Sequence, residues 1–342
     1  MVFDFFLWIF KSKYYHDYFN TFDYMEKMVQ ISDGFINEHT DFPELIAALK
    51  AGFGSKKISV PQRHHHDFPN PETGVDSTLL LMPAWHPGKE AGVKIATVSP
   101  ENSRFDLSAI QAIYILMDAV NGTVKAILQA KSLTAKRTAG ASALASSYLS
   151  KENANSLLMI GTGALSINLI RAHASVRPIE NVYVWGRNPE KAQTICHELR
   201  NENFRCQTVG TIEEKIAEVD IVSCATLSAT PLVFGKLLKK GQHIDLVGAY
   251  KKDMREADDE VIKIASIFVD TFSGLHENGD IAIPLEKGIL KESGIKGDLF
   301  SLCSGKTKGR IHEKEITLFK SVGHALEDLV AASYYYNKFT NA

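Results

Sequence analysis

The chain has 342 residues, a formal net charge of −2 and a hydrophobic content of 45%. This length allows two domains, or one core with a large insertion. The charge gives no basic footprint for nucleic acid, and no stretch reaches transmembrane length, so we expect neither nucleic acid nor a membrane as a partner. Four scattered cysteines form no CxxC pair, which favours reduced thiols in a cytoplasmic protein and argues against a zinc site.

The first residues are apolar but do not form a leader pattern. The run from Val2 to Phe10 is too short to span a bilayer and is interrupted by Asp4. It lacks a basic segment and a small-residue cleavage site. Residues 1–24 are rich in aromatic side chains without a helical or strand period. We expect them to be an extension that contributes no site residue; the alternative is that they pack on the substrate domain or widen a dimer contact.

Up to about residue 150 the sequence predicts a mixed α+β region. Helical patterns cover Phe42–Gly52 and Thr134–Leu149, and another helix is expected near the end of the chain, at Ser321–Tyr335. The pair Asn121-Gly122 predicts a hairpin turn. Short strands are expected at Leu79–Met82, Gly92–Val98, Ile113–Asp118 and Val124–Gln129.

After residue 150, strands and helices alternate. Helices are expected at Pro189–Arg200, with Asn188 as its N-cap, and at Ile212–Ala217. The expected strands are Leu157–Ile160, Val182–Trp185, Cys206–Val209, Ile221–Ala225, Ile244–Val247 and Ile267–Asp270. Alternating βα units predict an α/β fold, a doubly wound parallel sheet covered on both faces.

The most informative motif is the glycine turn after the first of these strands. Gly161 permits a tight turn, Gly163 lets a pyrophosphate approach the backbone, and Ser166 lets the next helix pack closely. The helix expected over Ala164–Val176 would direct its free N–H groups at that pyrophosphate. The spacing therefore predicts a dinucleotide site.

The end of the second strand bears on which dinucleotide is bound. NAD-specific sites place a carboxylate there for the ribose 2′-hydroxyl, whereas this chain has Trp185-Gly186-Arg187-Asn188. Arg187 can instead bind a 2′-phosphate; the alternative is a solvated loop arginine. NADP(H) is therefore the preferred cofactor, with NAD(H) possible.

Three basic residues of the first half are candidates for a substrate site. Arg63 follows Pro61-Gln62, Lys94 lies in an expected strand, and Arg137 lies at the head of a helix almost devoid of charge. Each alone can be a solvated charge, but a charge on a buried helix requires a partner, which a bound carboxylate would supply. The run His64–His66 is not a metal site, because adjacent strand residues alternate faces.

Together these motifs resemble the ornithine cyclodeaminase/mu-crystallin family over roughly residues 35 to 335. The resemblance rests on Pro61-x-Arg63, Gly92-x-Lys94, Leu133-Thr134-x-x-Arg137-Thr138-Ala139, Gly161-Thr-Gly163, Trp185-Gly-Arg187-Asn188, Val247-Gly248-Ala249 and Ser321-Val-Gly323-His-Ala325-x-x-Asp328. The family includes cyclodeaminases, alanine dehydrogenases and NAD(P)H-dependent reductases of ketimines and pyrroline-2-carboxylate.

The resemblance implies a homodimer in which a Rossmann domain is inserted into a mixed α+β domain for substrate binding and dimerisation. The expected division is 1–137 plus 320–342 for the substrate domain and 138–319 for the NAD(P)-binding domain. Arg63, Lys94 and Arg137 fall on the substrate-carboxylate positions, and Lys94 would be catalytic. The implied cofactor-binding residues are Thr138, Gly161, Thr162, Gly163, Ala164, Leu165, Arg187, Asn188, Val247, Gly248 and Ala249.

Departures from the family pattern distinguish between its activities. Cyclodeaminases carry an aspartate after the Gly-Gly or Gly-Ala pair and a glutamate just before the Leu-Met-Pro segment. Here those positions hold Tyr250 and Leu80, so both acid/base carboxylates are missing. Asp253 can substitute for the first, although a loop or helix-cap role is an equal alternative.

The sequence therefore predicts a reduced-nicotinamide reductase of a cyclic ketimine carboxylate, such as Δ1-pyrroline-2-carboxylate, which gives a cyclic amino acid such as L-proline. Two alternatives stay open. One is ornithine cyclodeaminase, a lyase that recycles NAD⁺ and releases ammonia. The other is a non-catalytic protein that holds NADPH and a small ligand.

Overall fold

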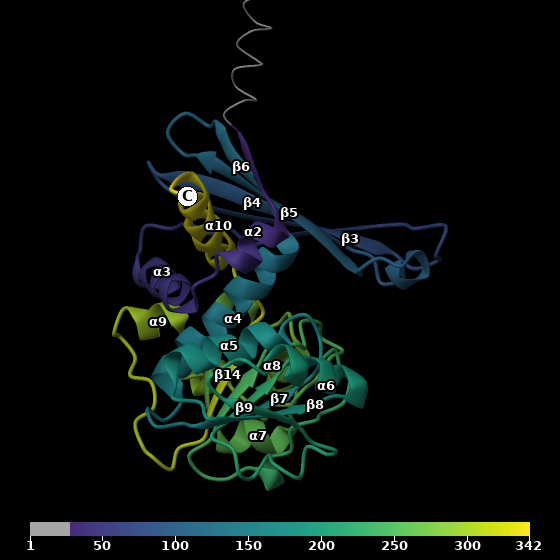
Figure 1. Cartoon of the computed structure of the whole chain (residues 1–342), viewed down its shortest axis with the longest axis vertical. Coiled ribbons are helices and arrows are strands. Elements are labelled where there is room, and N and C mark those ends of the chain that lie inside the picture. The colour runs from purple at the N-terminus through teal and green to yellow at the C-terminus, as the bar shows by residue number, and fades with distance from the viewer. Residues whose placement is uncertain (1–27) are drawn as a thin grey trace, which may run out of the picture.

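Two β-sheets organise the protein in the computed structural model, which describes residues 28–342 (Figure 1). Within these residues one sheet has six strands and belongs to the first part of the chain, and the other has eight. The extension expected at residues 1–24 lies outside the described residues. No helix within residues 28–342 combines the length and apolarity that a membrane crossing needs.

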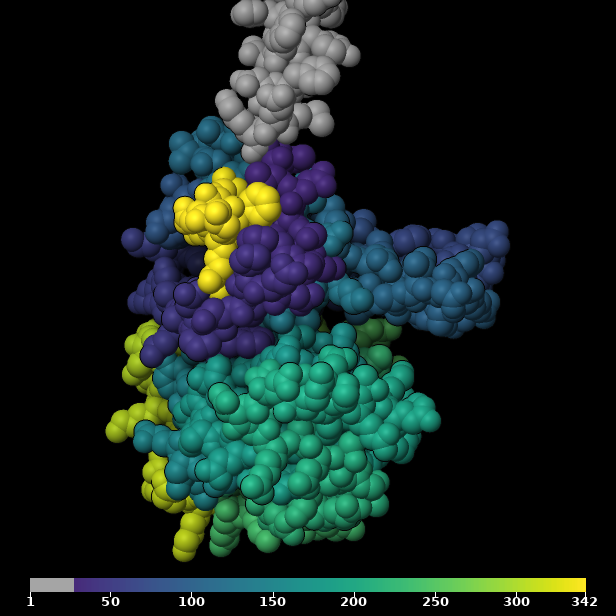
Figure 2. All heavy atoms as spheres, viewed as in Figure 1, coloured from purple at the N-terminus to yellow at the C-terminus, as the bar shows by residue number. Residues whose placement is uncertain are grey.

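The six-stranded sheet has the order β1-β6-β5-β4-β3-β2. Only β1 and β6 pair in parallel, and the other neighbours are antiparallel. Its strands are β1 (Val29–Ile31), β2 (His64–Phe68), β3 (Ser77–His86), β4 (Glu90–Val98), β5 (Ile110–Asp118) and β6 (Val124–Gln129). The hairpin predicted at Asn121-Gly122 is confirmed by the antiparallel β5–β6 pair. The ends of β2 to β5 project from the body as an arm (Figures 1 and 2).

Four helices accompany this sheet: α2 (Asp33–Glu38), α3 (Phe42–Gly54), α4 (Ala130–Leu149) and α10 (Ala325–Thr340). Helix α10 contacts β3, β4 and β5, so the last segment of the chain returns to the first domain. Helix α4 is buried along nearly its whole length although its residues are mostly small. Small side chains allow neighbouring helices to pack close to α4. At Gly140, for example, a Cβ would lie 2.9 Å from Leu49 Cδ1 of α3.

The eight-stranded sheet is parallel and follows the order β13-β12-β14-β11-β10-β7-β8-β9. Its strands are β7 (Ser156–Ile160), β8 (Asn181–Trp185), β9 (Arg205–Thr208), β10 (Ile221–Cys224), β11 (His243–Leu246), β12 (Ser266–Val269), β13 (Gly297–Asp298) and β14 (Thr317–Lys320). The chain order reverses between β7 and β10, which is the switch point where a doubly wound sheet binds its ligand.

Helices cover both faces of this sheet, as the alternation of buried residues in β7 requires. Leu157 and Met159 pack into the apolar cluster that includes α4 and α5, whereas Leu158 and Ile160 pack into the cluster on the opposite face. The helices of this region are α5 (Ser166–Val176), α6 (Pro189–Glu198), α7 (Asp259–Ile264), α8 (Gly279–Glu286) and α9 (Leu299–Cys303). The predicted α/β fold with a Rossmann sheet and a mixed α+β region is confirmed.

Three predicted helix positions need correction. Residues Ile212–Ala217 form successive turns instead of a helix, with an isolated helical hydrogen bond from Ile216 N–H to the carbonyl of Ile212. Helix α4 begins at Ala130, four residues before the predicted start, and α10 begins at Ala325, after the predicted Ser321. The predicted boundary at 137/138 stays a prediction; α4 runs unbroken through it.

Candidate active site

The glycine turn after β7 is built as its motif predicts. Gly161 has φ +120°, and a Cβ there would lie 2.6 Å from the carbonyl oxygen of Ala225, which follows β10. Its N–H donates to the carbonyl of Trp185 at 2.8 Å. Ser166, the first residue of α5, is fully buried and donates its hydroxyl hydrogen to the carbonyl of Gly161. Only glycine fits at position 161, where the loops after β7, β8 and β10 meet.

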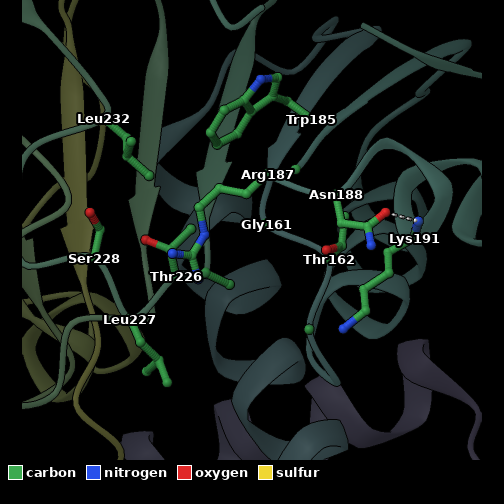
Figure 3. A pocket seen from close by; sticks show the side chains of 13 residues that line it. Gly161, Thr162, Trp185, Arg187, Asn188, Lys191, Thr226, Leu227, Ser228 and Leu232 are labelled. Atoms are coloured by element: carbon green, nitrogen blue, oxygen red, sulfur yellow. Dashed lines mark hydrogen bonds between the residues drawn. The ribbon is translucent and has the colours of Figure 1, made fainter. Parts of the chain in front are cut away.

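A cavity of about 460 Å³ opens at this turn (Figure 3). Five of its lining residues were predicted for the cofactor: Gly161, Thr162, Gly163, Arg187 and Asn188. A Cβ built at Gly163 meets no atom within 4 Å, so a pyrophosphate has room to approach the backbone and the start of α5. These residues fit a dinucleotide.

Other lining residues were missed: Lys191, Ala225, Thr226, Leu227, Ser228 and Leu232. Most of them follow β10, and the switch-point rule would have found them, since a ligand lies across the ends of both strands that flank that point. Conversely, six predicted cofactor residues do not line this cavity: Thr138, Ala164, Leu165, Val247, Gly248 and Ala249. Their predicted role stays a prediction.

The cavity contains no carboxylate. Its ionisable side chains are Arg187 and Lys191, both exposed. Arg187 points into the cavity (Figure 3) and makes no hydrogen bond or ion pair with any residue the structure describes. The side-chain oxygen of Asn188 is already used as the N-cap of α6, where it accepts from the N–H groups of Glu190 and Lys191.

A buried glutamate fixes the loop after β11. Glu256 Oε2 accepts hydrogen bonds from the N–H groups of Gly248 (2.8 Å) and Ala249 (3.2 Å), and Oε1 accepts from Thr226 N–H (2.7 Å). The acid that meets the Gly-Ala pair is therefore Glu256, whereas Asp253 is exposed. Tyr250 is half-buried, and burial, together with the nearby Asp253, raises its pKa.

A second group of charges lies between the first sheet and α10. Lys94 Nζ of β4 donates to Asp328 Oδ2 at 2.7 Å. Arg137 of α4 donates from Nε to Asp328 Oδ1 at 3.0 Å and from Nη1 to Glu327 Oε2 at 2.6 Å. Each cation keeps about 5% of its surface exposed, and the two acids none. We call these four residues the buried charge cluster.

Burial and pairing change the proton affinities in the buried charge cluster. Burial lowers the pKa of Lys94 to about 8, against the attraction of Asp328. Burial raises the pKa of Glu327 to about 7, although Arg137 opposes the shift. The pKa of Asp328 is lowered despite its burial, because Arg137 and Lys94 both stabilise the carboxylate. Lys94 and Glu327 are therefore the members closest to titrating near neutral pH.

The position of Arg137 corrects one sequence argument. The residue lies two turns inside α4 rather than at its head, and its charge is matched by Asp328 and Glu327 of this same chain. The sequence missed these partners because they are about 190 residues away. Nη2 makes no hydrogen bond with any described residue and is the nitrogen left for a ligand.

Arg63 lies at the edge of a smaller cavity of about 270 Å³. Its Nη2 pairs with Glu277 Oε2 at 2.7 Å and donates to the carbonyl of Gly323 at 3.3 Å. Gly323 also lines this cavity, and a Cβ there would lie 2.6 Å from Arg137 Nη1. The turn at Gly323 therefore contacts Arg63 on one side and Arg137 of the buried charge cluster on the other. Met82, which lines the same cavity, is the strand partner of Lys94.

No group of three or more His, Cys, Asp or Glu side chains within residues 28–342 could hold a metal ion. The three adjacent histidines lie in β2, where all of them are exposed.

Of the three predicted cations only Arg63 lines the smaller cavity, and Lys94 and Arg137 lie behind Met82 and Gly323. A Rossmann sheet with a carboxylate-free dinucleotide cavity, together with a small cavity next to these cations, is typical of a nicotinamide-dependent oxidoreductase. A model of the ornithine cyclodeaminase/mu-crystallin family matches residues 25–342, and the chain belongs to this family.

Comparisons with individual proteins agree with this assignment. Delta(1)-pyrroline-2-carboxylate reductase of Colwellia psychrerythraea is 35% identical over 301 residues, which cover 87% of this chain and 95% of that protein. An uncharacterised protein of Schizosaccharomyces pombe is 43% identical over 303 residues, or 85% of this chain and 92% of the relative. The structure of Thermococcus litoralis Delta(1)-pyrroline-2-carboxylate reductase, in complex with NADH and L-proline, matches with a TM-score of 0.85 and 30% identity, covering 92% of this chain and 98% of that one.

Proposed function

We propose that this protein reduces a cyclic ketimine carboxylate, with Δ1-pyrroline-2-carboxylate as the leading substrate and L-proline as the product. Its class, a nicotinamide-dependent oxidoreductase acting on carbon–nitrogen bonds, follows from the family and its reductase members. The identity of the ring is the new element of the proposal.

The observation that carries the proposal is that two arginines meet at one turn and that Lys94 is joined to one of them by a shared carboxylate. Arg63 and Arg137 both contact Gly323, and Lys94 shares Asp328 with Arg137. The adjoining cavity of about 270 Å³ suits a small molecule rather than a drug-sized one. A five- or six-membered ring with one carboxylate has this size and charge.

In this proposal the arginines bind the carboxylate and Lys94 handles the proton. Arg63 would exchange Glu277 for the substrate, and Arg137 would bind through Nη2, since Nε and Nη1 already hold Asp328 and Glu327. Lys94, with a pKa of about 8, is suited to give a proton to the imine nitrogen near neutral pH. The nicotinamide cofactor, when bound, supplies hydride to the carbon that bears the carboxylate.

Orientation is the protein's main contribution to such a step, because the two reacting carbons must be held in near-attack geometry. The proposed substrate cations extend from β4 (Lys94), α4 (Arg137) and the segment before β2 (Arg63), and Glu256 fixes the loops after β10 and β11. Asp328, which holds Lys94 and Arg137, and Glu256 are buried, which limits the movement of the groups they hold.

Reduction is favoured over ornithine deamination by the acids the site lacks. Tyr250 and Leu80 replace the two carboxylates of the cyclodeaminase pattern, and exposed Asp253 makes no hydrogen bond to any described residue. Neither Tyr250 nor Leu80 offers a carboxylate that could act as a base on a substrate amine.

For the cofactor, we propose NADP(H) over NAD(H). The support is the pair Arg187 and Lys191 in a cavity without a carboxylate.

We further propose a homodimer that forms through the outer face of the six-stranded sheet. By strand alternation, Met82, Ala84, Tyr114 and Leu116 face the body and are buried. The opposite face is apolar too: it carries Leu81, Trp85, Val93, Ile95, Ile113 and Ile115, half-buried or exposed. A face of this kind typically marks a protein interface.

One experiment separates the proposal from its alternatives. NADPH and NADH absorbance is followed with Δ1-pyrroline-2-carboxylate, and ammonia is measured with ornithine. Cofactor oxidation by the imine supports the reductase, ammonia release without net cofactor turnover identifies a cyclodeaminase, and cofactor binding without either reaction identifies a binding protein.

A further inference from the structure

Glu327 is a buried acid that uses only half of its carboxylate. Oε2 accepts from Arg137 Nη1 at 2.6 Å, whereas Oε1 is buried without a hydrogen-bond partner among residues 28–342. Its neighbour Asp328 differs, because Oδ2 accepts from Lys94 and Oδ1 from Arg137. A buried lone pair without a donor is costly, so Oε1 is the oxygen in the buried charge cluster best placed to accept a proton.

The buried charge cluster is balanced before any ligand binds. Two cations, Lys94 and Arg137, match two carboxylates, Glu327 and Asp328. A substrate that places another carboxylate on Arg137 makes the group net negative in a buried site, where an uncompensated charge is expensive.

Arg63, which bonds the carbonyl of Gly323, is a cation beside the buried charge cluster, but its charge is already matched by Glu277 at 2.7 Å. If Arg63 exchanges Glu277 for the substrate carboxylate, Glu277 is left unpaired, so the exchange adds no positive charge.

The other groups packed around the buried charge cluster do not relieve the imbalance either. Asp270, after β12, adds negative charge and is already held by Ser321, Val322 and Gly323. His324, at the N-cap of α10, has its pKa lowered by burial and stays neutral. Tyr114 of β5 has its pKa raised by burial and remains a neutral phenol.

We propose that binding of the substrate carboxylate draws one proton from solvent onto Glu327 Oε1, so that the site accepts an anion without gaining charge. The proposal rests on the function proposed above and assigns Glu327 as a positioning residue that acts through Arg137. The step forms one O–H bond and transfers no electrons.

The pKa values agree with this assignment. That of Glu327, about 7, is the highest of the acids in the buried charge cluster, and another negative charge nearby would raise it further. Substrate binding must then weaken as pH rises above 7, because ionised Glu327 opposes the incoming carboxylate. Lys94 adds a separate loss of binding near its own pKa of about 8.

The first test is the pH profile of kcat/KM for Δ1-pyrroline-2-carboxylate in the wild type and in Glu327→Gln. Glutamine keeps the size of the side chain and stays neutral at every pH. For a group with a pKa of about 7, the loss of kcat/KM between pH 7 and pH 8 should be about fivefold larger in the wild type than in the variant. The ratio of the two profiles removes the titration of the substrate. The charge of Glu327 also raises the pKa of Lys94, so the variant loses the Lys94 proton at a lower pH and the fivefold difference is an upper value. Glu44→Gln, an exposed carboxylate of α3 paired with Lys338 of α10, is the matched control and should keep the wild-type profile.

The second test uses only the wild type and so does not depend on the folding of a variant. Calorimetric titration of the NADPH complex with pyrrole-2-carboxylate, a ring monocarboxylate without a basic nitrogen, is run at pH 7.5 in buffers of different ionisation enthalpy. We expect uptake of more than about half a proton per ligand bound.

The outcomes distinguish the two levels of the account. An active wild type whose pH profile is unchanged in Glu327→Gln, or binding without proton uptake, overturns the role of Glu327 and leaves the reductase standing. Absence of imine reduction by the wild type at every pH overturns the proposed function, and this inference with it.

Discussion

The α-carbon of Gly323 lies against the guanidinium of Arg137. A Cβ built on Gly323 would be 2.6 Å from Nη1 and 2.8 Å from Nη2, and the residue has φ +83°. The carbonyl of the same glycine accepts from Arg63 Nη2. The turn that leads into α10 therefore leaves just enough space for Arg137 and accepts a hydrogen bond from Arg63. It sets the positions of both proposed carboxylate-binding groups.

This contact predicts that Gly323→Ala impairs catalysis. The added methyl must displace the Arg137 guanidinium, and displacements of about 1 Å in a reacting site can cost on the order of 100-fold in rate. We expect kcat/KM to fall by at least about tenfold. The matched control is Gly88→Ala, because Gly88 has a similar φ of +71° with no atom within 4 Å of its Cβ position. Equal activity in the two variants would show that the Gly323–Arg137 contact does not matter.

Arg137→Lys should disable turnover while sparing cofactor binding. A lysine cannot bind Asp328, Glu327 and a substrate carboxylate together, since its ammonium lacks the planar fork. Loss of two charged hydrogen bonds, at roughly 1.5–3 kcal/mol each, predicts a fall in kcat/KM of at least about 100-fold. Arg171→Lys, which changes the half-buried pair with Glu202 outside both cavities, serves as the control. Near-normal kcat/KM in Arg137→Lys would remove this residue from the site.

Arg187→Ala should change cofactor choice. Arg187 points into a dinucleotide cavity without a carboxylate. One charge-assisted hydrogen bond to a 2′-phosphate contributes roughly 1.5–3 kcal/mol, so its removal should weaken the binding of NADPH by about 10- to 100-fold. NADH affinity should change by less than about twofold. Fluorescence titration with both cofactors measures this, and Arg200→Ala, outside the cavity, is the control. Equal losses for the two cofactors would mean that Arg187 does not contact the 2′-phosphate.

Acid should destabilise the Rossmann domain through His243. Burial lowers the pKa of His243 to about 3, helped by Arg310, Arg177 and His173 and opposed by Asp245. Below its ordinary pKa of 6.5 the unfolded chain therefore takes up a proton that the folded chain excludes. Stability falls as pH drops from 6.5 towards 3, and the loss is about 2 kcal/mol at pH 5.

The check is urea unfolding at pH 7 and pH 5 for the wild type and for His243→Asn, which cannot become charged. The variant should lose about 2 kcal/mol less than the wild type between these pH values. His312→Asn, at an exposed histidine, should behave as the wild type does. Identical pH dependence in His243→Asn and the wild type would rule out His243 as the acid-sensitive group.

The Rossmann half was largely predictable because its signals are local. The strand Leu157–Ile160, the turn at Gly161 and the N-cap Asn188 each depend on neighbours a few residues away, and all are confirmed. The strand β14 was not predicted. It joins the sheet between β11 and β12, and its place depends on pairing with segments distant in the sequence.

The sequence singled out the three cations, whose role in substrate binding stays a prediction, but not most of the acids that the structure places beside them. The sequence shows charged residues within an apolar segment or a recognisable motif at three positions: Arg63, Lys94 and Arg137. Glu327, Glu256 and Glu277 were not singled out, since a glutamate on a helix or loop is ordinary until its burial is known. Their roles depend on contacts with residues far away in the chain, such as Arg137 for Glu327 and Arg63 for Glu277. These contacts exist only in the folded protein.

The central claim is tested most directly by following a labelled hydride. The protein is given Δ1-pyrroline-2-carboxylate and NADPH carrying deuterium at both C4 positions of the nicotinamide, and the product is analysed by mass spectrometry and NMR. The account predicts L-proline with one deuterium on the carbon that bears the carboxylate, in a one-to-one ratio with the oxidised cofactor. Proline without deuterium, or no proline while ornithine releases ammonia, would contradict it.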